Sequence, residues 1–64
     1  MEIKTSNGVT VDFEAAVNMM NDELREFVHA YHCEGTSPQE FFDIYATVHF
    51  ENLGEDFESI VENM

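Results

Sequence analysis

Residues 37–54 read "SPQEFFDIYATVHFENLG" and carry the start and the stop signal of one helix. Ser37 is a typical N-cap, Pro38 fits the first helical position, and Glu40 completes a capping box. The helix should end near Leu53, directly before Gly54. Its apolar side chains recur at helical spacing and predict one buried face, made of Phe41, Phe42, Tyr45, Val48 and His49.

The N-terminal stretch "EIKTSNGVTV", residues 2–11, predicts a β-hairpin. A two-residue turn at Asn7-Gly8 would mix apolar and charged side chains on both faces. A three-residue loop, Ser6–Gly8, instead pairs Ile3 with Val11 and places Gly8 in the left-handed position of a bulged turn. We favour this second register, whose apolar face consists of Ile3, Thr5, Val9 and Val11.

Between these two segments, the apolar period changes to that of a helix. One row of apolar residues at helical spacing, or stripe, follows the N-cap candidate Asp12, and a second stripe continues in phase with the first. A single helix over 13–33 would explain both, but "NDE" at 21–23 is a helix start, so we expect a break near Asn21. Gly35 is expected to end the segment. The stripes are Phe13, Ala16, Val17 and Met20, then Leu24, Phe27, Val28 and Tyr31.

The expected fold is α+β, with residues 1–64 forming one small domain. An N-terminal β-hairpin is followed by three to four short helices packed on a Phe-rich core. Helical spacing after Gly54 predicts a short last helix or a docked tail, built from Phe57, Ile60, Val61 and Met64.

The charge of the chain is strongly unbalanced. It carries 14 acidic residues against Lys4 and Arg25, for a formal net charge of −12. Such a charge disfavours nucleic acid and anionic membranes as direct ligands and favours a basic protein partner, or simple solubility. The single cysteine, the lack of a signal-peptide pattern and the lack of a long apolar run favour a cytoplasmic protein. We expect a monomer.

The acidic side chains fall into two groups that could bind such a partner. At 100° per residue, Glu40, Asp43 and Glu51 form a row roughly 16 Å long opposite the Phe face. Carboxylates on a rigid helix can replace phosphates in an Arg/Lys-lined groove. The alternative is an ordinary solvated surface. The row is extended by Glu55, Asp56 and Glu58, and the second group is Asp22, Glu23 and Glu26.

A metal site is the alternative chemical interpretation. Glu26 and His29 have the Glu-x-x-His spacing of carboxylate-bridged metal sites, and His32 and Cys33 follow directly. Such sites need two Glu-x-x-His motifs and two further carboxylates, and this chain has only one such motif. We therefore expect neither a metal nor another cofactor. We also expect no catalysis, because the acidic surroundings disfavour a Cys33 thiolate and so small a chain has little room for a cleft.

The segments "VDFEAAVNMMNDELREF" (11–27) and "QEFFDIYATVHFENLGEDF" (39–57) resemble short acidic proteins from mobile elements of gut bacteria. In size, layout and acidity the chain resembles the small anti-CRISPR inhibitors, in particular an inhibitor of the type I-C surveillance complex. The resemblance implies a non-catalytic inhibitor that blocks target-DNA binding by a CRISPR effector subunit in the bacterial host cell, as a DNA mimic. An anti-restriction protein or an antitoxin is the alternative.

Overall fold

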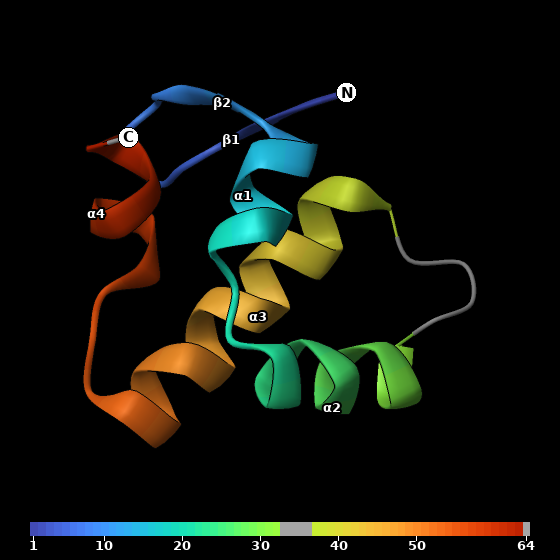
Figure 1. Ribbon diagram of the computed structural model, residues 1–64. Coiled ribbons are helices and arrows are strands. Elements are labelled where there is room, and N and C mark those ends of the chain that lie inside the picture. Colours follow the sequence, from blue (N-terminus) through green and yellow to red (C-terminus); the bar gives the residue numbers. More distant parts are fainter. Residues whose placement is uncertain (33–36, 64) are drawn as a thin grey trace.

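The computed structural model describes residues 1–32 and 37–63, and for His32 only the backbone. The hairpin consists of β1 (Glu2–Lys4) and β2 (Thr10–Asp12). Four helices follow, which are α1 (Phe13–Met19), α2 (Asp22–His32), α3 (Pro38–Leu53) and α4 (Phe57–Glu62). In Figure 1, α3 runs diagonally through the molecule, with α2 beside it and the hairpin and α4 at the opposite side. The predicted α+β class and element order are confirmed.

The hairpin has the three-residue loop expected from its sequence. Ile3 pairs with Val11, and Gly8 has a φ of 82°, a left-handed value that favours glycine. The Thr5 N–H donates to the Val9 carbonyl at 3.0 Å, which closes the loop. Three of the four predicted inward residues are buried, but Val9 is 39% exposed because it lies at the loop end of the sheet.

The expected break between two helices lies at Met20 and Asn21. Asp12 caps α1 by accepting a hydrogen bond from the Ala15 N–H at 3.2 Å. Met20 then becomes extended, with a ψ of 146°, and places its side chain in the core. The Asn21 side chain accepts from the Leu24 N–H at 3.1 Å and thereby starts α2.

Helix α3 begins and ends where its sequence signals predict. Ser37 Oγ accepts from the Glu40 N–H at 3.2 Å, and Pro38 occupies the first turn. Gly54 has a φ of 69°, and its N–H donates to the Phe50 carbonyl at 2.9 Å. Asp56 then caps α4, so the segment after Gly54 is a helix and not an irregular tail. The Gly35 expectation lies outside the described residues.

The core is built around the aromatic face of α3. Phe42 and Tyr45 are fully buried, and Phe57 of α4 packs against both, with ring centroids 5.8 Å and 4.7 Å away. The buried apolar residues come from every helix and from both strands. They are Ile3, Val11, Ala16, Met20, Val28, Phe42, Tyr45, Phe57 and Val61.

The expectation that the second apolar stripe lies in the core is wrong for two of its members. Phe27 is 53% exposed and Tyr31 is 71% exposed, whereas Val28 is buried. Val28 and the partly buried Leu24 join the same core as the first stripe, whereas Phe27 and Tyr31 lie on the outer side of α2. Phe41 is also only partly buried, and its ring lies 6.1 Å from that of Phe13.

Candidate functional site

The predicted carboxylate row lies on the outer face of α3. Glu40, Asp43 and Glu51 are all exposed and point away from the buried aromatic face, as their spacing predicts. Asp43 accepts a hydrogen bond from Gln39 Nε2 at 3.1 Å. Gln39 in turn bonds the Lys4 backbone through both of its side-chain polar atoms, which fixes this end of α3 to β1.

The three acids predicted to extend the row each contact a neighbouring element. Glu58 accepts from the backbone N–H and from the hydroxyl of Ser6, the latter at 3.0 Å. Asp56 accepts from the Glu58 N–H at 3.1 Å. Glu55 contacts the imidazole of His49 at 3.3 Å. The chain therefore turns back after Gly54, and these carboxylates also hold α4 against the hairpin and α3.

This turn creates a shallow open depression between α3 and the start of α4, with a volume of about 490 Å³. Phe50 is 61% exposed there. The Glu51 side chain forms no hydrogen bond or ion pair with the described residues. We call this feature the acidic depression, and its lining residues are Ala46, Thr47, Phe50, Glu51, Asp56 and Glu58.

The acidic depression combines two groups that bind a guanidinium. The face of an aromatic ring attracts a cation, and a carboxylate can accept two parallel N–H bonds from one arginine. Phe50 supplies the ring, and Glu51 and Asp56 supply carboxylates on either side of the turn. Phe50 was not among the predicted site residues. Its helical position lies outside the predicted buried face of α3, and this position indicates that the ring is exposed.

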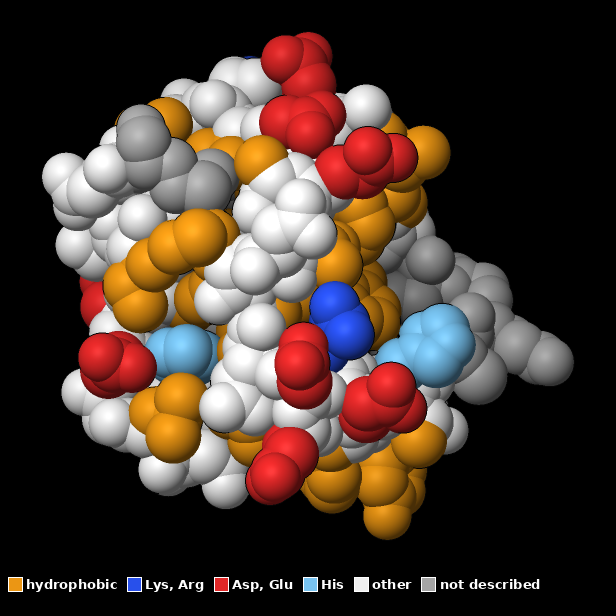
Figure 2. Space-filling view, in the orientation of Figure 1, with side chains coloured by type: hydrophobic (Ala, Val, Ile, Leu, Met, Phe, Trp, Pro, Cys, Tyr) orange, Lys and Arg blue, Asp and Glu red, His pale blue; other side chains and the backbone are white. Residues whose placement is uncertain are grey.

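The second predicted acidic group lies on α2. Asp22, Glu23 and Glu26 are exposed, and Asp22 forms an ion pair with Arg25 at 3.4 Å. These residues do not line the acidic depression. Figure 2 shows acidic side chains in separate groups over this face, with apolar and uncharged surface between them. The negative charge of this face is thus divided among several patches.

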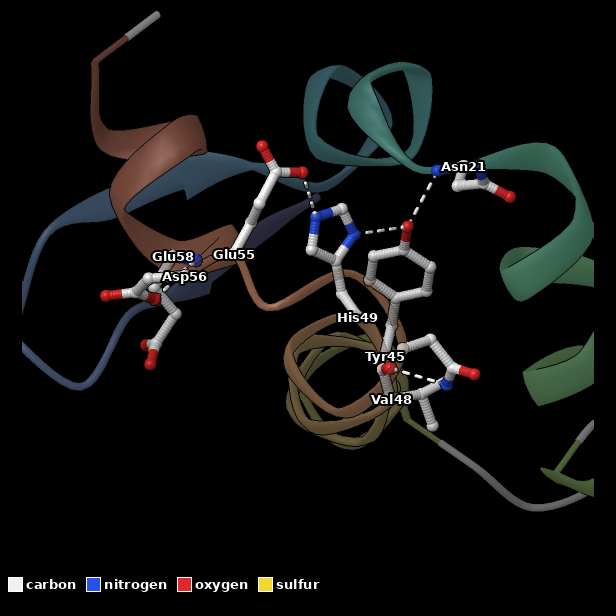
Figure 3. A network of polar contacts seen from close by, with 8 residues as sticks. Asn21, Tyr45, Val48, His49, Glu55, Asp56 and Glu58 are labelled. Atoms are coloured by element: carbon white, nitrogen blue, oxygen red, sulfur yellow. Dashed lines mark hydrogen bonds and ion pairs between the residues drawn. The ribbon is translucent and has the colours of Figure 1, made fainter.

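A buried polar network connects α3 to both of its neighbours (Figure 3). The Asn21 N–H donates to the Tyr45 hydroxyl at 2.7 Å, and this hydroxyl lies 2.9 Å from His49 Nδ1. A carboxylate only accepts, so the contact with Glu55 requires a proton on His49 Nε2. In the neutral imidazole with that tautomer, Nδ1 accepts the proton of the Tyr45 hydroxyl.

This network was not predicted from the sequence. His49 is only 4% exposed, and its position on the aromatic face of α3 was expected. Its partner was not identified, although Tyr45 lies one helical turn before it, a spacing that brings two side chains together. The network satisfies the polar atoms of both residues inside the core and holds the turn that carries Glu55.

We expect the protein to lose stability at alkaline pH through Tyr45. Burial raises the pKa of the Tyr45 hydroxyl above its usual 10.0, although the Asn21 N–H and Arg25 lower it. The folded state then binds this proton more tightly than the unfolded state, so stability is retained below pH 10 and falls as pH rises further. Melting temperatures between about pH 8 and pH 11 would measure the fall. Tyr45→Phe should flatten it, and an unchanged slope in that variant would contradict this role.

Among the described residues, the candidates for a metal site do not come together. His29 is exposed on α2, and its ring lies 6.4 Å from that of Phe41. The remaining histidine, His49, contacts Tyr45 and Glu55 and is buried in the core. The His32 side chain and Cys33 lie outside the described residues. No cluster of three metal-ligating groups occurs in the part of the chain that the structure describes.

Comparison with known families gives a match over residues 4–57, to the model of the anti-CRISPR protein AcrIC5. The chain belongs to the AcrIC5 family. Membership implies a non-catalytic inhibitor of a type I-C CRISPR system, and hence a CRISPR-Cas partner. The resemblance noted in the sequence is thereby confirmed.

No curated protein and no solved structure shows significant similarity to the chain. None of its described helices combines the length and the apolar character needed to cross a bilayer.

Proposed function

We propose that this AcrIC5 family member blocks target-DNA binding by occupying an Arg/Lys-lined groove of a type I-C effector subunit. The acidic depression carries the proposal, because it offers an exposed ring and flanking carboxylates at one place. Glu40, Asp43 and Glu51 continue the negative surface along α3. The groove would bind these carboxylates in place of DNA phosphates.

The charge density of the molecule determines where such mimicry can occur. A net charge of −12 over an accessible surface of 4204 Å² corresponds to one net negative charge per about 350 Å². Duplex DNA carries roughly one charge per 110 Å² when treated as a ~20 Å-wide rod. The average of the protein is about a third of that value, so mimicry requires local concentration of carboxylates, as at the acidic depression.

Rigidity also supports the proposal. The depression lies between two helices that begin at side-chain caps, and Glu58 ties α4 to the hairpin. A carboxylate held on a fixed scaffold loses less conformational entropy on binding than one on a mobile tail. The cost of holding so many like charges together is offset when arginine and lysine of a partner approach them.

An order-of-addition experiment tests the mechanism. An effector incubated with the inhibitor before target DNA should fail to bind the DNA, whereas an effector already bound to DNA should resist the inhibitor. The affinity of the inhibitor for the effector should also fall steeply as salt is raised, because the contact is between opposite charges. Unchanged DNA affinity of an effector saturated with the inhibitor would contradict the proposal.

A further inference from the structure

Helix α2 carries an aromatic pair on its surface, Phe27 and Tyr31. The two ring centroids are 4.9 Å apart with an interplanar angle of 47°. Val28 is buried and Leu24 is partly buried against the core, so these residues hold α2 in place while both rings stay largely exposed. An exposed apolar patch on a small protein commonly marks an interaction site.

Acidic side chains flank this aromatic pair. Glu23 lies one helical turn before Phe27, and Glu26 is exposed on the same helix. Figure 2 shows apolar side chains gathered at the lower edge of the molecule, where α2 lies in Figure 1, with acidic side chains beside them. The patch is thus apolar at its centre and negative at its border.

A second copy of the chain is a poor occupant of this patch. Each copy has a net charge of −12, and a symmetric contact would bring the same acidic borders together. A surface with arginine side chains fits both parts of the patch. Its guanidinium groups can stack on the rings and bind the carboxylates beside them.

We propose that the α2 aromatic pair is a second docking surface, which binds an arginine-bearing protein surface of the CRISPR effector. The inference rests on the proposed function, since it takes the same effector as partner. Phe27 and Tyr31 contribute contact area that salt screens little, while the carboxylates of α2 and of the acidic depression contribute the salt-sensitive part. Aromatic and arginine residues are the side chains that most often dominate binding energy at protein interfaces.

The double variant Phe27→Ala/Tyr31→Ala tests this surface by direct binding to the effector without DNA. We expect its affinity to fall by about tenfold or more, with a salt dependence equal to that of the unchanged protein. The variant Phe27→Leu/Tyr31→Leu keeps apolar area but removes the rings, so it should also bind more weakly. Circular dichroism and thermal melting check that both variants fold, and Tyr31→Ala alone provides a milder substitution if the double variants do not.

Wild-type affinity in the folded alanine variant would overturn the second docking surface. Wild-type affinity in the leucine variant would overturn its recognition of arginine by the rings. A concentration-dependent dimer that the alanine variant cannot form would identify a second copy as the occupant and also overturn the proposal. Failure of the proposed DNA-blocking function would give a different result from failure of this docking surface. The inhibitor would then still bind the effector through Phe27 and Tyr31, but the affinity of the effector for target DNA would stay unchanged.

Discussion

Phe57→Ala is expected to lower the free energy of unfolding by about 3–5 kcal/mol, the usual cost of removing a fully buried phenylalanine. The Phe57 ring contacts the rings of Phe42, Tyr45 and His49, at centroid distances of 5.8, 4.7 and 5.1 Å. A chain of 64 residues has a total stability of roughly 3–10 kcal/mol at ordinary values per residue. The variant should therefore be largely unfolded or melt far below the wild type, as measured by circular dichroism and urea titration.

Phe50→Ala is the matched control for this substitution. It removes the same side chain from a position that is mostly exposed, so the free energy of unfolding should change by only about 0.5 kcal/mol. Equal losses of stability in the two variants would contradict the assignment of Phe57 to the core.

The double variant Asp43→Lys/Glu51→Lys is expected to weaken binding to the effector by about a hundredfold or more. Both carboxylates lie on the outer face of α3, and lysine there would repel the basic groove that we propose as the partner. Glu40 is left unchanged because it lies in the first turn of α3, where a lysine would oppose the helix dipole. Binding would be measured by calorimetry or by surface plasmon resonance at fixed salt.

The variant Glu2→Lys/Asn18→Lys/Met19→Lys controls for net charge. It changes the total charge by the same amount, but the three residues are exposed on the hairpin and in the last turn of α1, away from the acidic depression. Its affinity should fall only through the weaker long-range attraction. If both variants lose the same affinity, net charge and not the α3 surface determines binding.

The local elements were predictable because their signals are short-range. The hairpin register follows from one apolar face and one glycine, Gly8, and α3 follows from its Ser37 cap and its Gly54 end. The break at Met20 was also indicated, since the "NDE" stretch offers a new helix start. Each of these features depends on side chains that contact the backbone within a few residues.

The surfaces were less predictable because they depend on how the helices are placed relative to one another. Phe27 and Tyr31 have the spacing of core residues, and only the position of α2 shows that they are exposed. The acidic depression likewise exists because α4 turns back over the flank of α3. The sequence predicted which carboxylates lie on the outer face of α3. It did not predict that the Phe50 ring lies beside the carboxylates of the acidic depression.

The contacts between α4 and the hairpin loop affect the order in which the protein can fold during synthesis. Ser6 meets Glu58 across 52 positions, and Asn7 meets Glu62 across 55. A nascent chain cannot secure its first loop until the ribosome has passed Glu62 and that segment has left the exit tunnel. The hairpin loop should consequently stay open to proteases until that point of synthesis and become protected in one late step.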